Sequence, residues 1–176
     1  MSTRIRLRHP ELKDCREFLS RVRASRELHY PWVTPPSSTA QFKSYIRRMQ
    51  APEHCGFLVC DAQTDAIAGV INISNIVLGF FRSGYLGYYA FAGFERQGLM
   101  REGLQAVIRH GFRKLKLHRL EANIQPDNAA SIALVRSCGF SKEGYSPRYL
   151  KICGRWRDHE RWAILSSSST ARPRAT

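Results

Sequence analysis

The segment GFERQGLMREGL, residues 93–104, places a glycine among cationic side chains where a helix is predicted to begin. The first amides of a helix, here those from Gly98 to about Arg101, have no partner within the helix and together carry about half a positive charge. Phosphate groups bind readily at such a position, and Arg96 and Arg101 would add positive charge. Taken alone, the segment also fits a plain helix start, because short glycine motifs are unspecific.

A second helix start lies in PDNAASIALVRSCGF, residues 126–140. Asn128 either caps this helix or offers its amide to a ligand beside it. Ser131 carries a hydroxyl one turn inside the helix, where it can make a local hydrogen bond. The two helices follow neighbouring strands of a strand–helix–strand unit, so both helix starts should open at one edge of the sheet. We expect a cleft there that accepts phosphates at one helix and amides along a strand.

The elements that position these residues follow from the period of the apolar side chains. The order is β-α-α-β-β-β-α-β-α-β-β, which indicates an α/β chain with a mixed sheet. Strands are predicted over residues 3–10, 56–62, 66–76, 83–93, 118–125, 141–154 and 157–165, and helices over residues 10–25, 37–50, 98–115 and 126–140. The segment RELHYPWVTPP, residues 26–36, is predicted to be rich in turns. We expect one domain over residues 1–165 and a disordered tail over residues 166–176.

Composition limits the class of protein. The 176 residues include 28 Lys and Arg against 14 Asp and Glu, and this net charge of +14 favours polyanionic partners such as RNA, ribosomes or phosphorylated cofactors. Five cysteines lack paired spacing, and His110 and His118 lie apart from any ligand cluster, so we expect reduced thiols and no metal site. Without a signal peptide or a run of about 18 apolar residues, we expect a cytoplasmic protein that does not contact membranes.

Three long segments resemble the GNAT acetyltransferases, and within them the RimJ/RimL-type ribosomal-protein N-acetyltransferases. These segments are GLMREGLQAVIRHGF, HRLEANIQPDNAASIALVRSCGF and KEGYSPRYLKICGRWRDHERWAIL, and the resemblance covers about residues 3–165. The EGY and GRWRDH motifs of the last segment are typical of the subgroup, and RELHYPW is similar to its acceptor-side loop. The resemblance implies an α/β (α+β) fold with a mixed, mostly antiparallel, twisted sheet, splayed central strands and helices on both faces.

The resemblance also implies acetyl-CoA as the acetyl donor. The phosphate-binding motif of the family falls on residues 95–100, where only Gly98 matches strictly. Glu95 stands in place of glutamine or arginine, Arg96 in place of a glycine, and Met100 in place of a small residue. Backbone N–H groups hold the phosphates, and any residue supplies these groups if its φ and ψ permit. The residues implied to bind acetyl-CoA are Tyr89, Ala90, Phe91, Glu95, Arg96, Gln97, Gly98, Leu99, Met100, Arg101, Asn128 and Ser131.

The reaction implied by the resemblance is attack of a neutral amine on the thioester carbonyl. A backbone N–H near Ala90 or Phe91 would bind the oxyanion. The tyrosine that protonates the departing thiolate in many members falls on Val135 here, so Ser131 is the best proton donor by resemblance. The base is either Glu121 acting through water, or a group elsewhere if Glu121 pairs with Arg119 or Arg113. Asp158 and His159 either hold their turn or orient the acceptor.

The acceptor amine leaves several alternatives open. Glu27 and His29 are candidates for its binding, and Tyr30 and Trp32 either line the acceptor mouth or seal the loop against the domain. The subgroup suggests a protein N-terminal α-amine as acceptor, with an antibiotic or a polyamine as the alternative. A GNAT-like module without catalysis, binding RNA or ribosomes through its basic faces, is the other class. The sequence fits a monomer or a homodimer.

Overall fold

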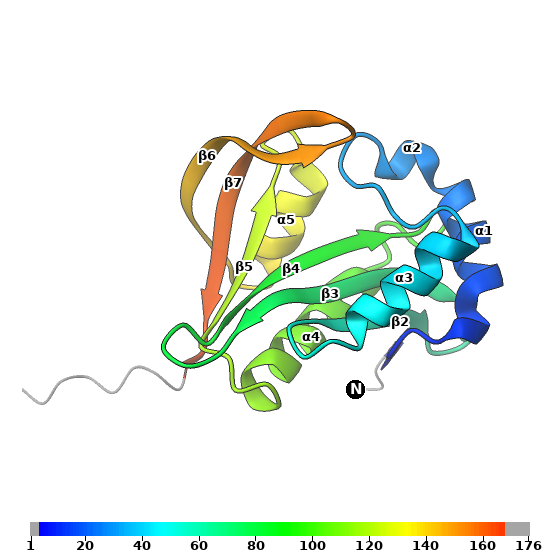
Figure 1. The fold of residues 1–176 in the computed structure, drawn as a ribbon, viewed down its shortest axis with the longest axis horizontal. Coiled ribbons are helices and arrows are strands. Elements are labelled where there is room, and N and C mark those ends of the chain that lie inside the picture. Colours follow the sequence, from blue (N-terminus) through cyan, green and yellow to red (C-terminus); the bar gives the residue numbers. More distant parts are fainter. Residues whose placement is uncertain (1–3, 168–176) are drawn as a thin grey trace, which may run out of the picture.

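A computed structural model describes residues 4–167 of the chain. Its strands are β1 (Ile5–Arg8), β2 (Cys55–Asp61), β3 (Ile67–Val77), β4 (Ser83–Ala90), β5 (Arg119–Ile124), β6 (Ser141–Ile152) and β7 (Arg155–Leu165). Within the described residues they form one sheet in the order β1-β2-β3-β4-β5-β7-β6 (Figure 1). The β4–β5 pair is parallel and every other neighbouring pair is antiparallel. The predicted mixed, mostly antiparallel sheet is confirmed.

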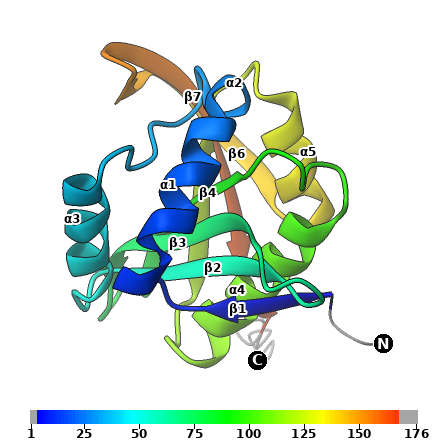
Figure 2. The ribbon, with the colours of Figure 1, turned by 90° about the vertical axis from the view of Figure 1, so that its right-hand side faces the viewer.

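Helices cover both faces of this sheet, as predicted. They are the short 3-10 helix η1 (Leu12–Asp14), α1 (Cys15–Ala24), α2 (Arg26–His29), α3 (Thr39–Met49), α4 (Leu99–Arg113) and α5 (Ala129–Ser137). Figure 2 shows α1 and α3 on one face and α4 and α5 on the other. None of the helices in residues 4–167 is long and apolar enough to cross a membrane.

The alternating side chains of the inner strands supply two separate cores. On β3, Val70 packs with Phe18 and Phe42 under α1 and α3, whereas its neighbour Ile71 packs with Leu104 and other residues of α4. These five side chains are almost fully buried. Because both faces are covered, β2 and β3 appear in the sequence as nearly continuous apolar runs instead of polar–apolar alternation.

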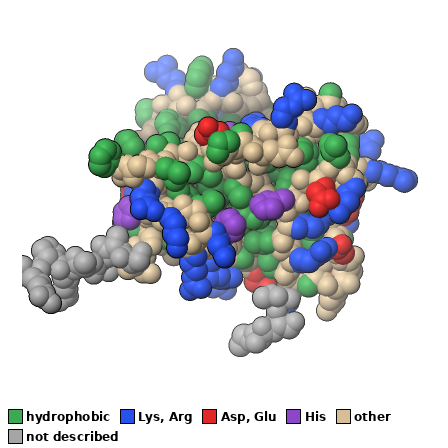
Figure 3. Space-filling model, turned by 60° about the horizontal axis from the view of Figure 1, so that its bottom comes forward, with side chains coloured by type: hydrophobic (Ala, Val, Ile, Leu, Met, Phe, Trp, Pro, Cys, Tyr) green, Lys and Arg blue, Asp and Glu red, His purple; other side chains and the backbone are tan. Residues whose placement is uncertain are grey.

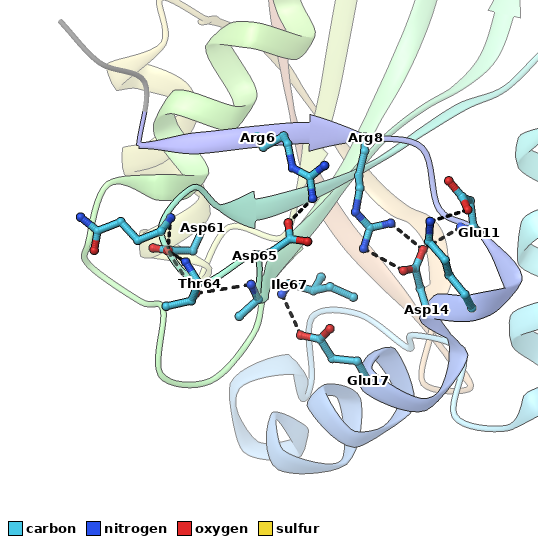
Figure 4. A network of polar contacts seen from close by, with 12 residues as sticks. Arg6, Arg8, Glu11, Asp14, Glu17, Asp61, Thr64, Asp65 and Ile67 are labelled. Carbon is cyan, nitrogen blue, oxygen red and sulfur yellow. Dashed lines mark hydrogen bonds and ion pairs between the residues drawn. The ribbon is translucent and has the colours of Figure 1, made fainter.

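A polar network fixes the first strand to the first helices (Figure 4). Both Nη atoms of Arg8 on β1 donate to the two carboxylate oxygens of Asp14 at 2.7 Å. Oδ2 of Asp14 also accepts a hydrogen bond from the backbone N–H of Glu11. Farther along, Glu17 of α1 accepts a hydrogen bond from the N–H of Ile67, the first residue of β3. The network therefore ties β1, α1 and β3 to one another at the edge of the domain.

The two parallel strands β4 and β5 separate after a short paired stretch. They pair from Ser83 opposite Arg119 to Leu86 opposite Ala122. Beyond this point β4 continues to pair with β3 up to Ala90, and β5 continues to pair with β7 up to Ile124. Each strand follows its outer neighbour, so a gap opens between them, and the splayed central strands predicted above are present.

The structure differs from the sequence prediction in two places. The segment predicted as turn-rich begins with the one-turn helix α2. Its four residues are too few to show a helical period in the sequence. At the other end, Ser166 is still held, because its N–H donates to the carbonyl of His118. Most of the tail predicted to be disordered, together with the first three residues, lies outside the described residues.

Candidate active site in the gap between two strands

The gap between β4 and β5 holds a cleft of about 1070 Å³. Its walls come from four places: α2 and the loop after it, the second half of β4, the loop that leads into α4, and the segment from Ala122 on β5 into α5. His159 of β7 completes it. The cleft lies where the sequence analysis expected one, at the edge onto which the N-termini of α4 and α5 open.

The loop before α4 has the backbone of an anion-binding turn. Arg96 and Gly98 both have positive φ, 59° and 80°, and Gly98 is the N-cap of α4. Glu102 donates its N–H to the carbonyl of Gly98, which leaves the amides of the first turn of α4 without a helical partner. These amides, with the Arg96 and Arg101 side chains beside them, favour an anionic group at this end of the cleft.

Side chains within the loop hold this shape. Oε2 of Glu95 accepts a hydrogen bond of 2.7 Å from the N–H of Gly93, and Nε2 of Gln97 donates one of 2.7 Å to the carbonyl of Gly93. Nη1 of Arg4 donates to the carbonyl of Gln97. The Glu95 carboxylate therefore has a structural partner within its own loop.

Met100, the other departure from the family motif, packs into a notch at Gly69 of β3. A side-chain carbon at position 69 would collide with Sδ of Met100 and with the carbonyl oxygen of Tyr89. The missing side chain of Gly69 therefore makes room for the large residue at position 100.

Nine of the twelve predicted cofactor residues line the cleft, and three do not. Phe91 is fully buried in the core under α1 and α3, and Leu99 is 3% exposed in the core under α4. The Gln97 side chain folds back onto Gly93. The side chains of these three residues do not reach the cleft, whereas the amide of Leu99 belongs to the open first turn of α4. The nine that line the cleft are Tyr89, Ala90, Glu95, Arg96, Gly98, Met100, Arg101, Asn128 and Ser131.

Ser131 has a partner that the sequence analysis did not identify. Its Oγ lies 2.7 Å from the phenolic oxygen of Tyr88 on β4, and both residues line the cleft. Burial raises the pKa of Tyr88, so the phenol stays protonated near neutral pH. Asn128 caps α5, since its Oδ1 accepts from the N–H of Ser131. The structure thus places a pair of coupled hydroxyls inside the cleft.

At the end of β4, the N–H and the C=O of one residue, Ala90, point into the cleft. The N–H of Phe91 donates to the carbonyl of Ala68 at 2.8 Å, so it is not available as the predicted oxyanion donor. Hydrogen-bonded and non-bonded pairs alternate along an antiparallel ladder, so Ala90, opposite Gly69, directs its N–H and C=O away from β3 and toward the gap. Its carbonyl accepts a hydrogen bond of 2.8 Å from Nε2 of His29, and its N–H faces the cleft.

Glu121 does not lie in the cleft. It stands opposite Tyr85, within the stretch where β4 and β5 still pair. Its Oε1 accepts a hydrogen bond of 2.7 Å from Nε of Arg119, which also pairs with Glu143. The geometry therefore gives no support to Glu121 as the base, and the sequence alternative, an ion pair with Arg119, describes it correctly.

The acceptor-side residues divide evenly. His29 and Trp32 line the cleft, whereas Tyr30 is 67% exposed and Glu27 is exposed, and neither contributes to the lining. His159, for which the sequence left a role in the turn or at the acceptor, lies in the cleft and is 3% exposed. Within residues 4–167 no three His, Cys, Asp or Glu side chains are grouped so as to hold a metal ion.

Comparison with known proteins agrees with this geometry. The profile of the acetyltransferase (GNAT) domain matches residues 4–141. The probable N-acetyltransferase YjcK of Bacillus subtilis is 30% identical over 156 residues, which is 89% of this chain and 83% of that protein. The [ribosomal protein uS5]-alanine N-acetyltransferase of Escherichia coli is 42% identical over 114 residues, 65% of this chain and 59% of that protein. Mycobacterium smegmatis RimJ in complex with CoA-disulfide superposes with a TM-score of 0.86 at 25% identity, covering 94% of this chain and 84% of that one.

Proposed function

The chain belongs to the GNAT acetyltransferase family and is an acetyl-CoA-dependent N-acetyltransferase, and from this premise we propose that its acceptor is the α-amine at the N-terminus of a protein. The name of the Escherichia coli relative assigns it an alanine of ribosomal protein uS5. That relative supports an N-terminal acceptor here, and ribosomal proteins are the first acceptors to test.

The charge of the cleft is the observation that carries the proposal. Among the described residues that line it, Glu95 is the one carboxylate, and Glu95 lies in the phosphate loop with its Oε2 on Gly93. The acceptor end is formed by neutral or imidazole side chains, among them His29, Trp32 and His159. A polyamine carries several ammonium groups, and a buried charge needs a partner. An acceptor end without carboxylates suits an acceptor whose only cation is the reacting amine.

The residues present fit acetyl-CoA, which when bound supplies the activated acetyl thioester. The open amides of the first turn of α4, with Arg96 and Arg101, would hold its phosphates. The unpaired edge of β4 beyond Leu86 offers N–H and C=O groups to its amides. We assign the oxyanion contact to the N–H of Ala90, because the N–H of Phe91 is bonded within the sheet.

We assign protonation of the departing thiolate to the hydroxyl pair of Tyr88 and Ser131. Ser131 and Tyr88 are hydrogen-bonded to each other, so a proton given up by one can be replaced through the other. The tyrosine that serves many family members from the helix is Val135 here, fully buried in the core. We therefore infer that Tyr88 supplies from β4 the phenol that α5 lacks.

The surface charge suits an encounter with ribosomes in the cytoplasm. Figure 3 shows Lys and Arg side chains spread over one face with few Asp and Glu side chains between them. A net charge of +14 accelerates the approach to a polyanionic particle, and salt weakens the effect. Arg119 does not add to this free positive charge, since it pairs with Glu121 and Glu143.

An acceptor screen tests the proposal. The purified protein is mixed with acetyl-CoA and one amine, and free thiol is followed over time. We expect a peptide beginning with alanine to react with a kcat/KM at least about 100-fold above that of spermidine, and the same peptide with a blocked N-terminus to be inert. Faster reaction with spermidine, or equal reaction with the blocked peptide through its lysines, would refute the N-terminal acceptor.

A further inference from the structure

We propose that His159 is the general base of the acetyl transfer, accepting a proton at Nε2 from the ammonium form of the acceptor. The proposal rests on the transfer of acetyl to an amine, whichever amine that is. It replaces Glu121, whose carboxylate lies outside the cleft.

The backbone fixes which nitrogen of His159 is the basic one. Nδ1 lies 2.9 Å from the carbonyl oxygen of Arg157, and a carbonyl only accepts, so Nδ1 carries the hydrogen. Nε2 then holds a lone pair in the neutral ring. Nε2 has no hydrogen-bond partner in residues 4–167, and it is not among the enclosed polar atoms without a partner. Nε2 is therefore not fully enclosed, and the cleft is the cavity that His159 lines.

His29, the other imidazole of the cleft, is arranged in the opposite way. Its Nε2 donates to the carbonyl of Ala90, so the lone pair is on Nδ1. That Nδ1 is fully enclosed and has no partner among the described residues. His29 consequently holds the end of β4 in place and cannot take a proton from an amine in the cleft.

Strand register places His159 across the gap from the reacting position. Continuing the β5–β7 pairing by one residue puts His159 opposite Gln125, and continuing the β4–β5 register puts Gln125 level with Tyr89. His159 is thus within one residue of the level of Ala90, whose N–H faces the gap. His159 and Ala90 both line the cleft.

The two faces of the sheet separate the base from the acid. Along β7, Glu160 and Trp162 alternate with His159, and Trp162 packs in the core on the α4 and α5 side beneath Arg136 of α5. His159 therefore faces the α2 side. Tyr88 packs on the α5 side, where it reaches Ser131. The acceptor amine would therefore lose its proton on the α2 side of the sheet, and the sulfur of the thioester would receive a proton on the α5 side.

Burial keeps His159 neutral near pH 7, against the effect of the polar groups around it. Burial lowers the pKa of His159, while the hydrogen bond to Arg157 and the charge of Asp158 on the same strand partly oppose this. The ring centroid of Tyr149 on β6 lies 6.1 Å from that of His159, and His29 of α2 lines the same cleft. A neutral imidazole is the form that accepts a proton.

The protons balance without another reactant. The ammonium N–H bond breaks, Nε2 of His159 gains that proton, and it later passes to solvent. The amine lone pair forms the N–C bond as the C–S bond breaks. The nitrogen loses its second proton to solvent as the amide forms, and solvent returns one proton to the Tyr88–Ser131 pair in place of the one that the sulfur took.

His159→Asn is the variant that tests the role, because the asparagine amide can still donate to the carbonyl of Arg157. His9→Asn is the matched control: Nδ1 of His9 also lies against a backbone carbonyl, that of Gly56 at 2.8 Å, and His9 is outside the cleft. We expect kcat/KM at pH 7 to fall about 100-fold or more in His159→Asn and to stay at the wild-type value in His9→Asn. CoA affinity by calorimetry and the thermal midpoint should be unchanged in both.

The pH profile separates a base from a residue that only positions the acceptor. In the wild type the acidic limb of kcat/KM should lie below 6.5, the ordinary value from which burial lowers the pKa of His159. In His159→Asn the acidic limb should move to the pKa of the amine itself, about 8 for an α-amine. The loss of kcat/KM relative to the wild type should become smaller above that pH. A deficit of the same size at every pH would overturn the proposal.

A second readout does not depend on turnover. Nitrogen-15 NMR of the free enzyme should show His159 as the neutral ring protonated on Nδ1 at pH 7, titrating below 6.5. A ring protonated on Nε2, or one that is charged at pH 7, would also overturn the assignment. The kinetic arm uses the amine that the wild type acetylates fastest, and the NMR arm uses no amine. Both therefore remain decisive if the preferred amine is spermidine and the N-terminal acceptor proposal has failed.

Discussion

The hydroxyl oxygens of Tyr88 and Ser131 lie 2.7 Å apart, although the two residues come from different elements, β4 and α5. If the pair acts as one proton donor, removing either hydroxyl should remove most of its effect. We expect Tyr88→Phe and Ser131→Ala each to lower kcat about 100-fold, and the double variant to be little slower than either. Steady-state kinetics with saturating acetyl-CoA measure this, and losses that multiply in the double variant would show two independent roles.

The backbone conformation at position 98 favours glycine, apart from any role of this residue in binding an anion. Its φ of 80° lies in the left-handed region, and a side-chain carbon there would approach Nη2 of Arg4 to 2.9 Å. We expect Gly98→Ala to lower the free energy of unfolding by about 1–2 kcal/mol, the usual cost of a left-handed residue. Urea denaturation measures the loss. Gly87→Ala is the control, because nothing lies within 4 Å of a side-chain carbon at that position.

The Gly69–Met100 contact predicts a partial rescue. Gly69→Ala should cost about 1–3 kcal/mol of stability, because the added methyl collides with Met100 and with the Tyr89 carbonyl. Met100→Ala removes only the first collision. In a double-mutant cycle we therefore expect Met100→Ala to restore part, but not all, of the stability lost in Gly69→Ala. Complete additivity of the two changes would contradict the contact.

The Arg8–Asp14 pair predicts an acid-sensitive contribution to stability. Burial on its own would raise the pKa of Asp14, but the hydrogen bonds from Arg8 and from the Glu11 amide outweigh it, and the net pKa is lowered. A depressed carboxyl pKa gives stability that is present above the unfolded-state pKa and is lost as the pH falls through the folded-state pKa. Asp14→Asn should therefore cost about 3 kcal/mol at pH 7, because it leaves a partly buried arginine without its partner.

The measurement for this pair is urea denaturation of wild type and Asp14→Asn between pH 7 and pH 3. The difference between the two should narrow as the pH falls below about 4. A constant difference over this range would mean that the ion pair is not the source of the stability.

Local pattern was enough to predict the helix starts at Gly98 and Asn128, because caps and apolar stripes are properties of a few consecutive residues. The same pattern could not find Tyr88, since its partner Ser131 lies 43 residues away and only the fold brings the two together. Strand alternation assigned Glu121 to a face, but it does not say where along the strand the neighbouring strand departs. Glu121 lies before that point, and the cleft begins after it.

The early separation of β4 and β5 also divides the sheet mechanically. In the described residues, the pairing of Ser83–Leu86 with Arg119–Ala122 is the only strand pairing that joins β1–β4 to β5–β7. Amide hydrogens along this junction should therefore exchange with solvent faster than those of the long β3–β4 and β6–β7 ladders. A ligand whose own amides bond to the free edge of β4 would bridge the two halves and slow that exchange, so the cofactor would act as a missing piece of the sheet as well as a reactant.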